Sequence, residues 1–518
     1  MHIIFIPLDE RPVNVDIPQQ VAAIAGVSIA IPRVRDLPAI RIAANLKNLH
    51  AWMLDQVGDR SATHLIACVD TVVHGGLIPG RISHESFGTV IERLEVFRLM
   101  KQTNPGLVTS AVSLIMRASD SYSAAEEPDY WSSYGRELHR VGVRLHKDLF
   151  AEILGKEGGS VSATSKGYEL SNEKIPPTIV GDFELRRLRN HLVNLSTMVL
   201  HEEGVIDTLA LTADDTAPYS AGSAEQVWLR HWKRGLPNGD SILMNPGADE
   251  VGAVLVARAL TEVTGSPAFA IMCGNIDELG RVPNFENVPL RESLNLQIGA
   301  AGGHLVAQGE IPDIALVVHP PDPSRGDYFG QIPDSDLDST RQTIAEIKRA
   351  MSAGYPVALA DLRFSNGGDP TLVDQLAEEG LLLQLSSYAG WNTAGNSIGS
   401  AVAHSTARWA GKKLGTFDQI QADRALLIRI IDDRFYQSGL RPRLHDELFG
   451  GEIGELSEEI QRVACARIIA EAQIYLDSIT GEQQSWMVKN VLLPWSRSFE
   501  IAIHLEKKID GHCISRST

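Results

Sequence analysis

The chain begins with the stretch HIIFIPLDERPVN at residues 2–14, in which an apolar run is followed directly by charged residues between two prolines. The first six residues have the length and the β-branched content of a strand that is buried on both faces. Asp9, Glu10 and Arg11 then occupy a turn that the prolines stiffen. Ligand sites in parallel α/β proteins form beyond the carboxyl ends of strands, so these charges either belong to a site or neutralise one another at a rigid turn. The residues alone give the two explanations equal weight.

Similar short apolar runs recur along the chain and alternate with longer amphipathic segments. The runs are VSIAIP (27–32), THLIACVD (63–70), VTSAVSLIMR (108–117), VIDTLALTADD (205–215), SILMNPG (241–247), FAIMCGN (269–275), IALVVHPP (314–321), PVALADLRFSNGG (356–368) and LLLQLSSYAGW (381–391). This alternation predicts an α/β fold with largely parallel sheets and flanking helices. The strands suffice for two doubly wound lobes or for a (β/α)8-like barrel, and a helical C-terminal region follows.

The 518 residues are too many for one ordinary core, so we expect more than one domain. Residues 1–235 are predicted to form an N-terminal α/β domain, with a helical insertion near 120–200 where no clear strand occurs. A second α/β domain is expected over 236–420. The pattern then becomes helical, which predicts a mainly helical region over 421–518 that includes a last strand around FEIAIHLE.

Composition restricts the class of partner. The chain has 47 Lys and Arg against 65 Asp and Glu, a net charge of −18, which disfavours nucleic acid and anionic membrane surfaces. No apolar run approaches the length of a membrane span, and the four cysteines form no CxxC pair. We expect a cytoplasmic bacterial protein that acts on a small molecule, with the oligomeric state left open.

Almost every expected strand is followed by a carboxylate, an amide or an imidazole. A single Asp or Asn is best explained as a turn or helix cap, and Asp369 before Pro370 is expected to be such a cap. The adjacent acids Asp214 and Asp215 are harder to explain in this way, because neighbouring carboxylates repel unless a cation, an arginine or a proton separates them.

Several familiar motifs are missing or misplaced. The sequence has no Walker A segment, no GxGxxG after a strand and no HExxH, so a bound nucleotide is not expected. GNSIG (395–399) matches the nucleophile elbow by letter, but Ser397 falls well past the expected strand end and inside the following helix. We interpret this match as accidental.

Seven segments in order, PLDERPVN, DTVVHGGLIPGR, TADDTAPYS, NPGADEVG, FSNGGD, SYAGWNTAGNSIG and LPWSRSFE, resemble the bacterial domain-of-unknown-function 4127 family over most of the chain. The ordered set is specific where a single piece would not be. The resemblance implies one shared site. Its members would be Asp9, Glu10, Arg11, Asp70, Asp214, Asp215, Glu250, Asn366, Asp369, Trp391, Asn392 and Asn396.

The inventory of these residues favours a glycoside hydrolase that cleaves a small sugar conjugate. Glycosidic cleavage needs one protonated carboxyl group as acid and one ionised carboxylate as nucleophile or base. We expect Asp214 or Asp215 to serve as one of the pair and Glu250 or Asp9 as the other, with no cofactor. The remaining residues would bind the carbohydrate: Glu10, Arg11, Asp70, Asn366, Asp369, Trp391, Asn392 and Asn396.

Two alternatives stay open. A metal-dependent hydrolase or sugar isomerase would use the same acids with His319 or His74 to hold a divalent metal, although no compact metal-ligand spacing occurs. A non-catalytic small-molecule binding protein would need only Trp391 and the asparagines, which leaves the acids without a role.

Overall fold

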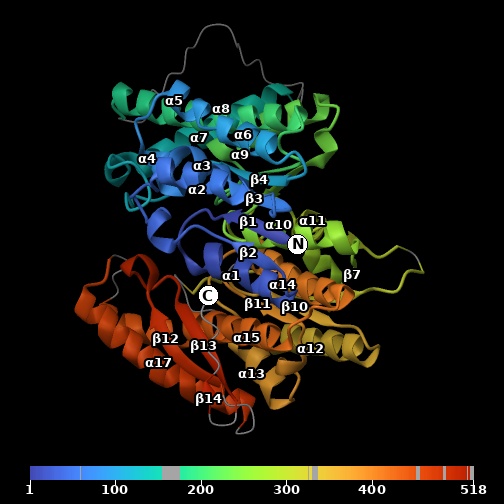
Figure 1. The fold of residues 1–518 in the computed structure, drawn as a ribbon. Helices are drawn as coiled ribbons and strands as arrows, with labels where there is room; N and C mark the ends of the chain where they lie inside the picture. Colours follow the sequence, from blue (N-terminus) through green and yellow to red (C-terminus); the bar gives the residue numbers. More distant parts are fainter. Residues whose placement is uncertain are drawn as a thin grey trace. The chain divides into compact units, whose positions relative to one another are not determined.

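The computed structural model describes residues 1–58, 60–153, 175–307, 309–324, 326–328, 336–450, 455–481, 486–509 and 512–513. The chain forms two compact units (Figure 1). Unit 1 contains Met1–Asp9, Ala30–Ala248 and Phe285–Val288. Unit 2 contains Glu10–Ile29, Asp249–Asn284 and Pro289–Thr518.

Unit 1 is built on a six-stranded sheet in the order β2-β1-β3-β4-β5-β6. The pairings from β1 through β6 are all parallel, so the carboxyl ends of these strands lie at one edge. β3 and β5 are buried along their whole length, which explains why their sequences are continuous apolar runs. The strands are β1 (His2–Ile6), β2 (Ser28–Ala30), β3 (His64–Cys68), β4 (Val108–Ile115), β5 (Thr208–Ala213) and β6 (Ile242–Pro246).

The helices of unit 1 cover this sheet, and α2, α6 and α8 supply most of the side chains that pack on it. The described part of the expected insertion is helical, since it holds α7 and α8, while residues 154–174 lie outside the described residues. The helices are η1 (Val34–Asp36), α2 (Leu46–Gly58), α3 (Val69–His74), α4 (Leu77–Ile82), α5 (Phe87–Glu92), α6 (Glu95–Thr103), α7 (Trp131–Ile153), α8 (Pro177–Glu202), α9 (Ala221–Gly235) and η2 (Gly239–Ser241).

Unit 2 contains a second parallel sheet in the order β11-β10-β9-β7-β8. α12 and α13 pack against β9 and β10, α14 contacts β10 and β11, and α1 packs on α10 and α14 (Figure 1). The strands are β7 (Ala268–Met272), β8 (His304–Leu305), β9 (Ile314–His319), β10 (Val357–Asp361) and β11 (Ser387–Ala389). The helices are α1 (Pro12–Ile24), α10 (Val251–Thr264), η3 (Ile276–Gly280), α11 (Leu290–Ala300), α12 (Leu337–Ser352), α13 (Pro370–Glu378), η4 (Leu382–Gln384) and α14 (Ala394–Leu414).

The C-terminal region of unit 2 is mainly helical and has a hydrophobic core of its own. α17 packs against β12 of a small antiparallel sheet, and β13 lies where the last strand was expected. The elements are α15 (Gln419–Arg429), the π-helix η5 (Ile430–Leu440), α16 (Arg441–Leu444), η6 (His445–Phe449), α17 (Glu458–Thr480), β12 (Trp486–Leu492), η7 (Pro494–Ser496), β13 (Ala502–Ile509) and β14 (His512–Cys513).

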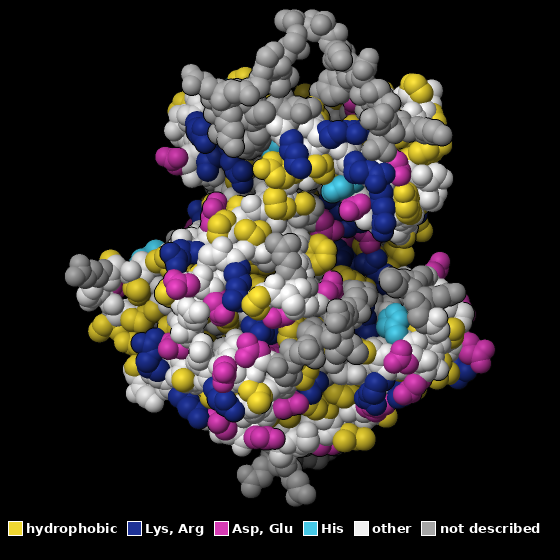
Figure 2. All heavy atoms as spheres, turned by 180° about the vertical axis from the view of Figure 1, so that it is seen from behind, with side chains coloured by type: hydrophobic (Ala, Val, Ile, Leu, Met, Phe, Trp, Pro, Cys, Tyr) yellow, Lys and Arg dark blue, Asp and Glu magenta, His cyan; other side chains and the backbone are white. Residues whose placement is uncertain are grey.

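The expected fold class is confirmed, and of its two forms the barrel is excluded, because both parallel sheets of the described chain are open. The main stretch of unit 1 ends at Ala248, against residue 235 in the division expected from sequence, and Glu10–Ile29 and the residues after 420 lie in unit 2. Among the described residues no helix has both the length and the apolarity needed to cross a bilayer. Acidic and basic side chains are interspersed on the face drawn in Figure 2.

Candidate functional site

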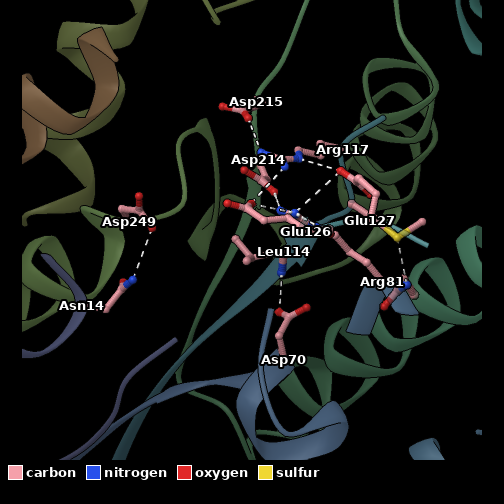
Figure 3. Close-up of polar contacts among 12 residues, drawn as sticks. Asn14, Asp70, Arg81, Leu114, Arg117, Glu126, Glu127, Asp214, Asp215 and Asp249 are labelled. Carbon is pink, nitrogen blue, oxygen red and sulfur yellow. Dashed lines mark hydrogen bonds and ion pairs between the residues drawn. The ribbon is translucent and has the colours of Figure 1, made fainter. Parts of the chain in front are cut away.

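The TADDT loop after β5 carries the best organised group of charged residues in unit 1. The carboxylate of Asp214 is buried and accepts a hydrogen bond from the guanidinium of Arg81, which is itself only 2% exposed. Arg81 comes from α4, at the end of the segment GGLIPGR. Both side chains are shielded from water, so the positive charge of Arg81 replaces the hydration that the Asp214 carboxylate loses on burial (Figure 3).

Asp215 is the accessible member of the pair. Its side chain is 40% exposed, and its φ of +36° lies in the left-handed region that residues other than glycine avoid. Arg117, which follows β4, donates to Asp215 at 2.6 Å and holds Glu126 and Glu127 at 3.0 and 2.9 Å (Figure 3). Desolvation by the surrounding protein raises the pKa of Asp215, and the Arg117 guanidinium counteracts this increase.

Asp70 lies at the same edge of the sheet, in the first turn of α3 after β3. The backbone N–H of Leu114 donates to its carboxyl group at 3.0 Å. Burial raises the pKa of Asp70 to about 7, and the negative charge of Asp214 adds to this increase. Unit 1 therefore combines a carboxyl group whose pKa is raised to about 7 with acids that form ion pairs with arginines.

The PLDERP turn is fixed to the start of α3. The hydroxyl of Thr71 is fully buried and lies 2.8 and 2.9 Å from the carbonyl oxygens of Pro7 and Leu8. Asp9, in the turn that follows β1, is buried and is the last residue of the first stretch of unit 1.

Glu10 and Arg11 belong to unit 2, where they make structural contacts. The indole of Trp495 donates to Glu10 at 2.7 Å. Arg11 binds Asp249 with two hydrogen bonds of 2.5 and 3.2 Å, and its guanidinium stacks 4.5 Å from the Trp495 ring. These bonds make the arginine a clamp between the start of α1 and the start of α10.

Glu250 is fully buried in the helix packing of unit 2. The amide of Gln297 donates to it at 2.7 Å, and a Cβ added at Gly399 would lie 2.4 Å from its Cγ. Gly399 therefore has to be a glycine so that α14 can approach Glu250 closely. This environment gives Glu250 a packing role, and its expected catalytic role stays a prediction.

The carboxyl edge of the second sheet holds a buried network. The Nε2 atom of His319 lies 3.0 Å from Asp369, and its Nδ1 lies 2.8 Å from the hydroxyl of Thr343. Asp361 accepts from the backbone N–H of Asp369 at 2.7 Å and from the hydroxyl of Tyr388 at 3.2 Å. Burial raises the pKa of Asp361 to about 6.

Asp369 is the helix cap that its position before Pro370 predicted, because its carboxylate accepts from the N–H of Thr371 at 2.9 Å. Its second bond, to His319, was not foreseen. A cap that also anchors an imidazole fixes where α13 begins relative to β9.

Two strained loops meet above this network. Asn366 and Asn392 have φ of +61° and +62°, and the N–H of Asn366 donates to the carbonyl of Asn392 at 3.0 Å. Asp433 of η5 supports both loops, since its carboxylate accepts from Gly390 at 2.7 Å and its carbonyl accepts from Gly368 at 2.9 Å. π-Helices are often associated with function, and here the extra residue per turn brings an acid beneath the loops.

Trp391 lies in the loop before α14, and Asn396 lies in the first turn of that helix. The Trp391 ring is only 4% exposed and packs edge-on against Phe499, so little of its face is accessible to a sugar in this structure. The side chain of Asn396 donates to Thr393 at 3.1 Å. Ser397 lies inside α14, as expected, and its hydroxyl donates to the carbonyl of Trp391 at 3.1 Å.

The structure thus brings Asp70, Asp214 and Asp215 together in unit 1. In unit 2, Asn366 and Asn392 lie in hydrogen-bonded loops above the network of Asp369, and Glu10 and Arg11 share contacts with Trp495. Glu250 lies apart from these groups, in the helix packing. Sequence reasoning missed Arg81 because it looks like a residue of a Gly-rich turn, although the segment that contains it was singled out. It also missed Glu126 and Glu127.

For metal binding, no three His, Cys, Asp or Glu side chains of the described residues are grouped so that they could hold an ion. His74 is buried, and this burial, helped by Arg189 and Arg93, lowers its pKa to about 3.

Asp70→Asn should change how stability depends on pH. A carboxyl group whose pKa is raised on folding destabilises the folded protein as pH rises from the unfolded to the folded pKa. Since the pKa rises from 3.8 to about 7, we expect the melting temperature of the variant, relative to wild type, to increase between pH 4 and pH 8. Asp55→Asn, at an exposed site on α2, is the control. A difference that is the same at all pH values would contradict the raised pKa.

Arg81→Met should leave the buried carboxylate of Asp214 without its partner. We expect a loss of about 3–5 kcal/mol in the free energy of unfolding, and recovery of most of it in Arg81→Met/Asp214→Asn, measured by urea denaturation. Arg98→Met removes a surface ion pair with Glu203 and should cost less than about 1 kcal/mol. Equal costs for Arg81→Met and Arg98→Met would rule out a buried, mutually dependent pair.

Asn392→Gly and Asn392→Ala test the strained loop. Alanine pays about 1 kcal/mol in the left-handed region and glycine does not, so the glycine variant should be the more stable in thermal denaturation. At Asn295, an exposed position within α11, the order should be reversed, because glycine destabilises a helix by about 1 kcal/mol relative to alanine. The same order at both sites would show that the loop is not strained.

Comparison with known proteins supports the family resemblance that the ordered motifs indicated. No curated protein and no solved structure matches the chain. The model of the family described as "Protein of unknown function (DUF4127)" matches residues 3–504, nearly the whole length. The chain therefore belongs to the DUF4127 family.

Proposed function

We propose that this protein is a glycoside hydrolase that cleaves a small sugar conjugate with the carboxyl groups of unit 1. The observation that carries the proposal is the pairing of two kinds of carboxyl group at one sheet edge. Burial raises the pKa of Asp70 to about 7, so it can carry a proton near neutral pH, while Asp214 and Asp215 are ion-paired with Arg81 and Arg117. Glycosidases use one protonated carboxyl group together with one ionised carboxylate, and the Arg117 guanidinium favours the ionised form of Asp215.

The roles follow from protonation and exposure. Asp70 is the general acid that protonates the leaving oxygen, because a pKa of about 7 lets it hold and give up a proton near neutral pH. Asp215 is the nucleophile or base, because it is the more exposed of the two neighbouring acids and its strained backbone holds it out from β5. Asp214 and Arg81 form the buried support beneath it.

This assignment gives Asp70 the catalytic role that the sequence had suggested for Asp9 or Glu250. Asp9 lies in the same unit, after the end of β1, and remains a candidate for the second catalytic carboxylate. Glu250 lies in the helix packing of unit 2, with Gln297 on one side and Gly399 on the other.

Leaving-group dependence tests these roles. The wild type and Asp70→Asn are assayed on a panel of nitrophenyl glycosides and on the methyl glycosides of the same sugars. Nitrophenolate leaves without a proton and an alkoxide does not, so Asp70→Asn should lose at least about 100-fold in kcat/KM on methyl glycosides and much less on nitrophenyl glycosides. Asp215→Asn should reduce both, and Asp55→Asn should reduce neither.

Two outcomes would contradict the proposal. One is unchanged activity of Asp70→Asn on the methyl glycosides. The other is a loss of wild-type activity on chelation that a single divalent ion restores, which would favour the metal-dependent hydrolase or isomerase.

A further inference from the structure

Unit 2 contains a cavity of about 260 Å³ near the carboxyl ends of β9 and β10. Its wall comes from three stretches: residues 281–284 before α11, residues 321–323 and 326 after β9, and the loop after β10 together with the first turn of α14. All of these stretches belong to unit 2. The volume lies just below the range of about 300–1,000 Å³ that drug-sized ligands occupy, which suits a ligand with a single ring.

The charges at this cavity are already paired within the protein. Arg363 is 3% exposed and binds Asp322 at 3.3 Å and Asp336 at 2.9 Å. Arg281 binds Glu278 at 2.8 Å and donates to the carbonyl of Pro321 at 2.6 Å. Since the guanidinium groups have carboxylate partners, the cavity favours a neutral ligand over an anion.

Hydrogen-bonding groups of both kinds nevertheless converge on the cavity. Asp322 brings a carboxylate, and Ser365 and Thr393 bring hydroxyl groups that can donate as well as accept. Arg363 also borders the cavity, and the Asn284 side chain there donates to the Ser365 hydroxyl at 3.1 Å, which leaves the proton of that hydroxyl available to a ligand.

Apolar side chains form another part of the wall. Phe364 lines the cavity, with its ring held edge-on by Tyr328 at 5.8 Å, together with Pro283, Pro321 and Pro323. A wall of this kind suits the C–H face of a saturated ring, while the polar groups suit hydroxyl groups around its edge.

We propose that this cavity is a binding site for a single-ring polyhydroxylated ligand, such as a monosaccharide or a cyclitol. It is a different site from the carboxyl groups of unit 1, and the inference concerns binding alone, so it does not depend on the proposed hydrolysis. Its members were not among the site residues expected from the sequence. The adjoining residues Asn366 and Asn392 shape the loops that form its wall.

Binding to the full-length protein tests the proposal, with isothermal titration and saturation-transfer NMR as the measurements. The probes are glucose, galactose, mannose, N-acetylglucosamine and myo-inositol, with inorganic phosphate and acetate as anionic probes. We expect at least one of the neutral probes to bind. Failure of all five, or binding of an anionic probe alone, would overturn the proposal.

Variants locate the binding. Ser365→Leu fills the cavity and should weaken the neutral probe at least tenfold, whereas Ser352→Leu, at an exposed position at the end of α12, should leave its affinity unchanged. Ser365→Ala removes only the hydroxyl and should weaken binding about threefold or more, which keeps the test decisive if the leucine variant does not fold. Unchanged affinity in the folded Ser365 variants would place the ligand elsewhere and overturn the proposal. Loss of binding in these variants with intact hydrolysis would separate this site from that of unit 1.

Discussion

A carboxylate that this chain buries has to be compensated, because an uncompensated charge in the interior costs several kcal/mol. Each buried acid at the two sheet edges meets this requirement in a different way. Asp214 has an arginine, Asp70 has a proton and a backbone N–H, and Asp361 accepts from a backbone N–H and a tyrosine. The manner of compensation decides which acid is ionised near neutral pH, and therefore which chemistry each one can support.

The same acids hold the backbone of the surrounding loops. Asp433 supports the loops of Asn366 and Asn392 from below, and both asparagines have left-handed conformations that cost free energy. Asp215 is strained in the same sense above the ion pair of Asp214 with Arg81. Strain of this kind persists only where surrounding contacts impose it, and in both units those contacts come from buried acids.

The fold class followed from local pattern. Runs such as THLIACVD and IALVVHPP are mainly apolar, without the alternation of a half-exposed strand, because parallel strands are covered on both faces, and that property is visible in a single sequence. The cap at Asp369 and the helical position of Ser397 were predictable for the same reason, since both depend on neighbouring residues. The choice between barrel and open sheets was not predictable, because it depends on which strand edges pair over long separations.

The candidate site was predictable only in part. Sequence alone determined that polar residues follow the strands and that Asp70, Asp214 and Asp215 lie at strand ends, because the chain direction in a parallel sheet gathers these ends at one edge. Tertiary structure alone decided which acid has its pKa raised toward neutral pH, that Arg81 binds Asp214 at a sequence separation of 133, and that Trp391 and Glu250 are buried. Protonation and burial depend on the distances and desolvation that folding creates between distant residues, and no local pattern encodes those quantities.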